Sequence, residues 1–101
     1  MSENLINLVK KIRDRKNQDR DKSYTSSLLS GGLSKCIDKM EEEFSEFKEA
    51  LNDNSNVVHE AADIIYHILV TLESANIKFE DVLKELENRK EQSGIEEKNN
   101  R

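Results

Sequence analysis

The chain has 101 residues, of which 35% are hydrophobic and 37% charged, and its formal net charge at pH 7 is −5. This length allows one domain with a small core. Residues 1–22 carry seven Lys and Arg against four Asp and Glu, so the rest of the chain is strongly acidic. An acidic body argues against nucleic-acid binding, which needs a broad basic face, and suits a protein that holds cations.

The single cysteine, Cys36, excludes an internal disulfide framework and any cage of thiolate metal ligands. It suits a reducing cytoplasm, and we expect it to pack in the core. The apolar run from Leu5 to Val9 is too short for a signal peptide. No segment approaches the ~20 apolar residues of a membrane span. The sequence therefore predicts a cytoplasmic protein with no membrane partner.

The first helix is predicted from Ser2 or Glu3 to Lys16. Its apolar residues recur at the i, i+3, i+4, i+7 spacing of an amphipathic helix, and they are Leu5, Leu8, Val9 and Ile12. The chain has no proline, so few interior positions interrupt such helices. A charged loop, Asn17 to Lys22, is expected to follow.

A short helical turn is predicted next. Ser23-Tyr24-Thr25 offers it a cap, and it runs through Leu28 and Leu29. Gly31-Gly32 is expected to end or bend this turn. Ser34 is then in place to cap the helix that follows.

Two long helices come next, about Lys35 to Leu51 and about Asn56 to Ser74, joined by a turn at Asn52 to Asn56. One face of the first of them is apolar and consists of Ile37, Met40, Phe44, Phe47 and Leu51. The apolar arc of the second is far wider than a surface helix needs. A chain of this size has little with which to cover it, so we expect a homodimer.

The last helix is predicted at about Glu80 to Glu91. The fold class is therefore all-α, a helical hairpin or four-helix bundle completed by dimerisation. We expect the domain to span residues 1–92 and residues 93–101 to form a polar, disordered tail.

Carboxylates form two columns on the long helices. At 100° per residue, Glu42, Glu43 and Glu46 share a stripe with Lys35 and Lys39. Glu60 and Asp63, which are three residues apart, lie in a second stripe that continues to His67. Such a stripe is often only the solvated face of a helix. However, like charges at these spacings each cost an isolated helix roughly 0.2–0.5 kcal/mol, so something should offset the repulsion.

A divalent cation would offset it directly, because Mg²⁺ prefers oxygen ligands and keeps several waters for a substrate's phosphates. The short turn favours an antiparallel hairpin, which would bring the two carboxylate columns face to face. The pattern is then Glu42-Glu43-x-x-Glu46 on one helix and Glu60-x-x-Asp63 on the next. The pair of motifs is much more specific than either half.

These motifs resemble the all-α nucleoside-triphosphate pyrophosphatase superfamily and, within it, the phosphoribosyl-ATP diphosphatases of histidine biosynthesis. The resemblance covers about residues 2–90. Its further support comes from Ser23-Tyr24-Thr25-x-x-Leu28-Leu29, Gly32, Lys35, Lys39, Glu60-Ala61-Ala62-Asp63-Ile64-Ile65-Tyr66-His67, Val70, Val82, Glu85-Leu86 and Arg89. The chain departs from the family pattern at Glu41, where glycine is usual, and at the bulky Phe44 and Phe47.

The resemblance implies hydrolysis of phosphoribosyl-ATP to phosphoribosyl-AMP and pyrophosphate, with Mg²⁺, or Mn²⁺ as a substitute, as cofactor. The implied metal ligands are Glu43, Glu46, Glu60 and Asp63. Glu42 would orient or deprotonate the attacking water, or it would hold one of the metal ligands in position. The implied substrate-binding residues are Ser23, Tyr24, Thr25, Lys35 and Lys39.

Three other interpretations remain at this point. A broader pyrophosphatase would share the metal site and differ in its base pocket. A di-iron carboxylate bundle needs Glu-x-x-His motifs, and neither His59 nor His67 has a glutamate three residues before it. A non-enzymatic helical interaction protein would carry the acidic stripes as plain surface. For Lys39 the alternative role is an ion pair with Glu43, and for His67 it is a hydrogen bond within the bundle.

Overall fold

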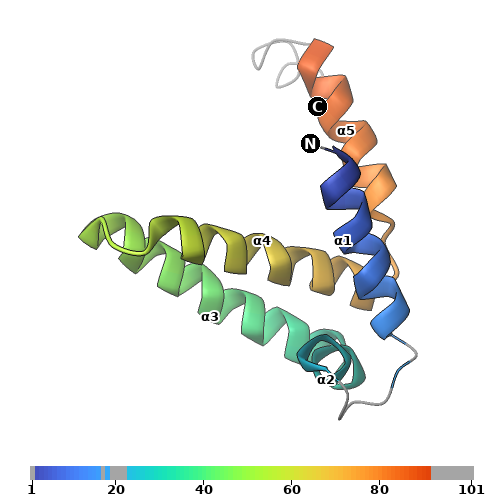
Figure 1. Cartoon of the computed structure of the whole chain (residues 1–101), viewed down its shortest axis with the longest axis horizontal. Coiled ribbons are helices and arrows are strands. Elements are labelled where there is room, and N and C mark those ends of the chain that lie inside the picture. Colours follow the sequence, from blue (N-terminus) through green and yellow to red (C-terminus); the bar gives the residue numbers. More distant parts are fainter. Residues whose placement is uncertain (1, 17, 19–22, 92–101) are drawn as a thin grey trace.

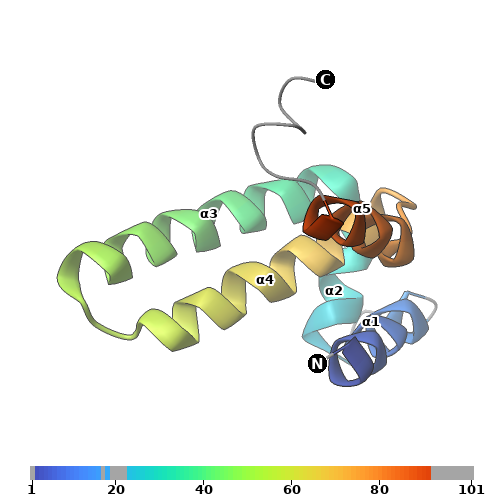
Figure 2. The same cartoon turned by 90° about the horizontal axis from the view of Figure 1, so that it is seen from above.

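The computed structural model describes residues 2–16, 18 and 23–91. Within these residues there are five helices and no strand, which confirms the all-α prediction. They are α1 (Ser2–Arg15), α2 (Tyr24–Ser30), α3 (Gly32–Asp53), α4 (Val57–Ser74) and α5 (Phe79–Glu91). Figures 1 and 2 show α3 and α4 as an antiparallel hairpin, with α1, α2 and α5 gathered at the end away from its turn. Most of the predicted charged loop and the whole predicted tail lie outside the described residues.

The short helix α2 begins as the sequence predicts. The Ser23 side chain accepts a hydrogen bond from the backbone N–H of Ser26 at 3.0 Å, which caps the helix. The prediction for Ser34 was wrong, because α3 already begins at Gly32 and Ser34 lies inside it. Gly31 is the N-cap of α3 without a side-chain bond, and Gly32 has a φ of 86°, a value that suits glycine.

The turn of the hairpin consists of Asn54, Ser55 and Asn56. Asn54 and Asn56 adopt left-handed conformations with φ of 52° and 59°, which asparagine tolerates better than most residues. The Asn54 N–H closes α3 by bonding to the carbonyl of Ala50. The predicted turn is therefore confirmed in place, although α3 extends two residues further than expected at this end.

The hydrophobic core lies at the open end of the hairpin, where α1 and α2 meet α3 and α4. It consists of Val9, Ile12, Leu28, Cys36, Leu69, Val70 and Phe79. Cys36 is free and only 1% exposed, which confirms its expected packing role. Near the turn, by contrast, α3 and α4 are the only described helices in contact.

One edge of this hairpin is apolar and uncovered. The predicted apolar face of α3 is partly exposed at Ile37, Phe44 and Leu51. On α4, Val58, Ile65 and Ile68 are exposed as well, and Val58 is 84% exposed. Met40, Glu41, Phe44, Ile64 and Ile68 line an apolar hollow of about 290 Å³ between the two helices. None of the described helices is both long and apolar enough to cross a membrane.

Candidate metal centre

The carboxylates meet along the other edge of the hairpin. Glu43 and Glu46 are one turn apart on α3, and Glu60 reaches them from the first turn of α4. One oxygen of each lies within 4.8 Å of the others. The tertiary structure thus brings together three of the four predicted ligands from two helices.

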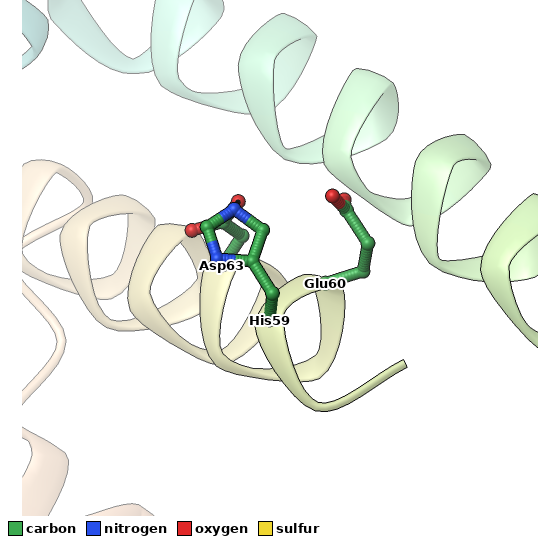
Figure 3. Close-up of side chains that lie close together, drawn as sticks. All are labelled: His59, Glu60 and Asp63. Carbon is green, nitrogen blue, oxygen red and sulfur yellow. Dashed lines mark ion pairs between the residues drawn. The ribbon is translucent and has the colours of Figure 1, made fainter. Parts of the chain in front are cut away.

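Asp63, the fourth predicted ligand, belongs to an adjoining group. Oxygens of Glu60 and Asp63 and a ring nitrogen of His59 also lie within 4.8 Å of one another. His59 Nε2 is 3.3 Å from Asp63 Oδ2. Figure 3 shows Glu60 directed toward α3, with His59 and Asp63 together beside it on α4. Glu60 is therefore the residue that the two groups share.

The cluster is electrostatically unsatisfied. Glu43 Oε2 and Glu60 Oε2 are buried and have no hydrogen-bond partner among the described residues. Burial, followed by the charge of Glu46, raises the pKa of Glu43. Burial and the charges of Glu46 and Asp63 likewise raise the pKa of Glu60. Both shifts mean that this arrangement disfavours the ionised carboxylates, first because they are shielded from water and then because they repel one another.

These residues fit a hard divalent cation. Ligand oxygens at 2.0–2.1 Å from Mg²⁺ stand roughly 3–4 Å apart around an octahedron. The oxygens of Glu43, Glu46 and Glu60, within 4.8 Å of each other, approach this spacing. A cation there would partner the two orphaned oxygens and offset both the burial and the repulsion that raise the two pKa values.

Glu42 lies outside both groups. Its Oε2 is 3.1 Å from Lys39 Nζ, and its side chain is 63% exposed. Hydrogen bonding to Glu42 also raises the pKa of Lys39. The alternative that Lys39 pairs within its helix is therefore realised, with Glu42 as its partner and not Glu43. Lys35, one turn before Lys39, is exposed. Its side chain lies close over Gly31, because a Cβ added to that glycine would stand 2.2 Å from Lys35 Cδ.

The helix α2 borders the cluster through Tyr24. His67 Nδ1 lies 2.8 Å from the carbonyl oxygen of Asp63, so Nδ1 carries the proton and donates it. His67 Nε2 then accepts from the Tyr24 hydroxyl at 3.1 Å. His67 is 5% exposed, which confirms its predicted hydrogen bonding within the bundle.

Ser23 and Thr25 flank Tyr24 and are engaged within the fold. The Ser23 hydroxyl caps α2 and donates to Ser26 Oγ at 2.9 Å. Thr25 is buried, and its hydroxyl contacts that of Tyr66. Their role in substrate binding stays a prediction.

The family model for phosphoribosyl-ATP pyrophosphohydrolase matches residues 5–90 of this chain. The chain belongs to this family. A phosphoribosyl-ATP pyrophosphatase of Rhizobium etli (strain CIAT 652) is 40% identical over 99 residues, which cover 96% of this chain and 92% of that protein. The enzyme of Roseobacter denitrificans is 44% identical, and the match covers 89% of this chain and 88% of that protein. The enzyme of Vesicomyosocius okutanii is 41% identical, and the match covers 100% of this chain and 98% of that protein.

Sequence reasoning missed the place of His59 in this pyrophosphohydrolase. The sequence presents His59 only as a candidate for a di-iron motif, which it does not complete. His59 and Asp63 are four residues apart on one helix, and this spacing could have predicted their contact. The bond from Tyr24 to His67 joins residues 43 positions apart, and no local pattern predicts it.

Proposed function

We propose that the carboxylates between α3 and α4 form the catalytic metal centre with which this chain hydrolyses phosphoribosyl-ATP. Family membership makes the chain a hydrolase of this substrate in histidine biosynthesis, releasing phosphoribosyl-AMP and pyrophosphate. The observation that carries the assignment of the centre is the pair of buried oxygens without partners, Glu43 Oε2 and Glu60 Oε2. A fold that retains such oxygens among like charges has a use for a cation there.

In the reaction, a water oxygen bonds to the α-phosphorus and the bond to the bridging oxygen of the β-phosphate breaks. When bound, Mg²⁺ or Mn²⁺ neutralises phosphate charge and lowers the pKa of a coordinated water. Glu43, Glu46 and Glu60 would hold the ion, and Asp63 would join them from the adjoining group. The pyrophosphate leaves with the electrons of the broken bond.

Glu42 remains our proposed residue for orienting or deprotonating the water. Its exposed carboxylate stands one residue before Glu43 and is bound to Lys39. A substrate phosphate that binds Lys39 would release Glu42 from this ion pair. Tyr24 supports the same site, because its hydroxyl is held beside the carboxylates by His67.

The decisive experiment is release of pyrophosphate from phosphoribosyl-ATP by the purified chain with Mg²⁺. We expect turnover that stops when the metal is chelated and returns when it is restored. A panel of ordinary nucleoside triphosphates in the same assay separates a phosphoribosyl-ATP enzyme from a broader pyrophosphatase. Turnover that survives complete chelation would contradict the proposed centre.

We also propose that two copies pair through the apolar edge of the hairpin. The exposed Phe44 and Ile68 border the same hollow on α3 and α4, and burying them would remove large apolar surface from water. Light scattering should give twice the mass of the chain. Ile68→Glu should shift this toward the monomer, whereas Ser45→Glu, which places the same charge at an exposed polar position of α3, should not. A monomeric wild-type chain would contradict the dimer.

A further inference from the structure

A second hollow lies away from the apolar edge, between α1, α2 and α4. Its volume is about 180 Å³. A phosphate group fits a hollow of this size. The lining residues are Leu8, Lys11, Ile12, Arg15, Ser23, Thr25 and Tyr66, and we call this hollow the α1–α2 pocket.

The polar lining of the α1–α2 pocket has the chemistry of an anion site. Lys11 and Arg15 stand one turn apart on α1 and supply the positive charge. The hydroxyls of Ser23, Thr25 and Tyr66, which bond within the fold, complete the polar lining. Among the described lining residues none is Asp or Glu. The charge of the lining is therefore positive, although the net charge of the chain is −5. Lys11 and Arg15 belong to the basic segment of residues 1–22. Arginine is well matched to phosphate oxygens, because its planar guanidinium donates two parallel hydrogen bonds.

Arg15 is held in place before any ligand arrives. Its Nη1 donates to Gln18 Oε1 at 3.1 Å, and its carbonyl oxygen accepts from Ser26 Oγ at 3.0 Å. The second bond ties the end of α1 to α2. Arg15 and Tyr66 line the same pocket. Burial and the neighbouring Tyr24 raise the pKa of Tyr66, while the charge of Arg15 opposes this shift.

A chain of side-chain contacts connects the lining of this pocket to the metal centre. Tyr66 contacts Thr25, and its ring lies edge-on to His67 with centroids 5.4 Å apart. His67 in turn bonds Tyr24 and the carbonyl of Asp63. A substrate that reaches both sites would have one end at the carboxylates and the other at Arg15.

We propose that the α1–α2 pocket binds the phosphate of the phosphoribosyl group of the substrate, with Arg15 and Lys11 as specificity-determining residues. The proposal rests on the proposed metal centre, which takes the triphosphate. Phosphoribosyl-ATP carries this additional phosphate at a distance from the triphosphate, and ATP lacks it. Phosphoribosyl-AMP retains it after hydrolysis, and pyrophosphate does not. The pocket therefore distinguishes the substrate from ordinary nucleotides and holds only one of the two products.

The test compares Arg15→Gln and Lys11→Gln with Lys10→Gln, a matched control because Lys10 is exposed on α1 and does not line the pocket. Loss of one charged hydrogen bond to phosphate should raise KM for phosphoribosyl-ATP roughly ten- to a hundredfold, with kcat little changed. The inhibition constant of phosphoribosyl-AMP should rise by a similar factor, while that of pyrophosphate stays constant. Arg15→Lys should fall between Arg15→Gln and wild type.

Binding without turnover separates this proposal from the proposed centre. In the presence of a chelator, calorimetry should show that phosphoribosyl-AMP binds wild type and Asp63→Asn but not Arg15→Gln. An unchanged KM in Arg15→Gln and Lys11→Gln, with active wild type, would overturn the pocket and leave the centre standing. Inhibition constants of both products that rise together would also overturn it. Should Arg15→Gln fail to fold, the exposed Lys11→Gln still decides the matter.

Discussion

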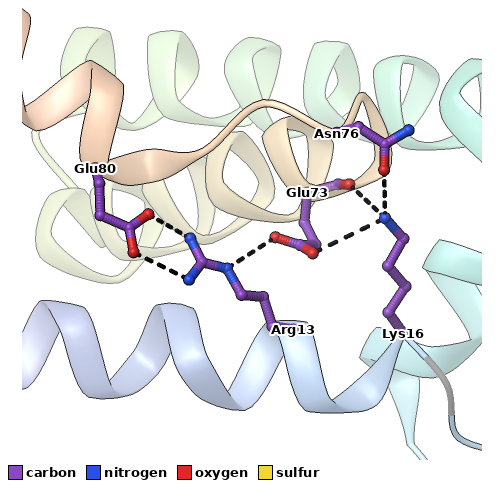
Figure 4. A network of polar contacts seen from close by, with 5 residues as sticks. All are labelled: Arg13, Lys16, Glu73, Asn76 and Glu80. Carbon is purple, nitrogen blue, oxygen red and sulfur yellow. Dashed lines mark hydrogen bonds and ion pairs between the residues drawn. The ribbon is translucent and has the colours of Figure 1, made fainter.

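The chain has two contrasting groups of charged side chains. One lies where α1 passes the turn between α4 and α5, and it consists of Arg13, Lys16, Glu73 and Glu80. The other lies between α3 and α4, and it consists of Glu43, Glu46 and Glu60. In the first group, shown in Figure 4, opposite charges alternate. Arg13 donates to Glu73 Oε2 at 3.4 Å and to Glu80 Oε2 at 3.0 Å. Lys16 donates to the carbonyl of Glu73 at 3.2 Å and to Asn76 Oδ1. In the second group only carboxylates come together.

The two groups perturb ionisation in opposite directions. The hydrogen bond from Arg13 lowers the pKa of Glu80 to about 2, whereas burial and like charge raise the pKa of Glu43 and Glu60. The first group thus stabilises the folded chain by its own pairing, whereas in the second Glu43 Oε2 and Glu60 Oε2 have no hydrogen-bond partner among the described residues. The contrast teaches that a charge cluster becomes a candidate site when the fold leaves it unpaired, and not merely when it is dense.

The largest expected effect comes from Asp63→Asn and Glu60→Gln, which keep side-chain shape and remove the charge that holds a cation. Turnover should fall at least ~100-fold, because loss of a mere supporting residue around a metal already costs 10–100-fold. Steady-state release of pyrophosphate measures this. The control is Glu49→Gln, an exposed position on α3 outside both carboxylate groups. Wild-type turnover in Asp63→Asn would remove that residue from the centre.

Added Mg²⁺ should stabilise wild type by ~2.7 kcal/mol at a hundredfold excess over its Kd, because the ion binds the assembled cluster and not the unfolded chain. This corresponds to a rise of roughly 10 °C or more in Tm for a domain of this size. Glu60→Gln should lose most of the gain, since Glu60 belongs to both groups. Arg13→Gln should retain it in full. If Mg²⁺ raised the Tm of Glu60→Gln and Arg13→Gln equally, the carboxylate group would not be the site of the ion.

Arg13→Gln should lower the free energy of unfolding by about 1 kcal/mol, because it breaks partly exposed bonds to both Glu73 and Glu80. We expect Tm to fall by about 4–8 °C. Lys10→Gln on the same helix serves as the control. Thermal unfolding of metal-free protein measures both, and in the same experiment Glu60→Gln should be as stable as wild type or slightly more so. A destabilised Glu60→Gln would show that its carboxylate is already satisfied.

The smallest effect is the pH dependence that Glu80 contributes. Its pKa is lowered from 4.5 to about 2 in the folded chain, so the stability it adds is present above the unfolded value of 4.5. That contribution is lost as the pH falls toward 2, because the unfolded chain then binds the proton first. The difference in Tm between wild type and Glu80→Gln should therefore be largest near neutral pH and shrink below about pH 4. A difference in Tm that does not change with pH would show that the ionised Glu80 does not contribute to the network.

The sequence alone determined which carboxylates share a helical face. A period of 3.6 residues places Glu43 with Glu46 and Glu60 with Asp63, whatever the rest of the chain does. The short turn between the helices then made an antiparallel hairpin the expected arrangement, and the structure confirms that Glu60 faces Glu43 and Glu46. The helices and the Ser23 cap of α2 were predictable for the same reason, since they depend on residues close in sequence, whereas the cap predicted at Ser34 was wrong.

Only the tertiary structure decided which members of each stripe meet. Glu42 shares the predicted stripe of Glu43, but α4 faces Glu43, and Glu42 is left to Lys39 and solvent. Phe44 and Leu51 follow the apolar period, yet no other described element covers the edge of the hairpin on which they lie. Arg13 and Glu80 are 67 residues apart, and Arg15 and Tyr66 come together only when α1 reaches α4. Helical periodicity assigns a residue to a face of its own helix, whereas the packing of separate helices determines what that face contacts.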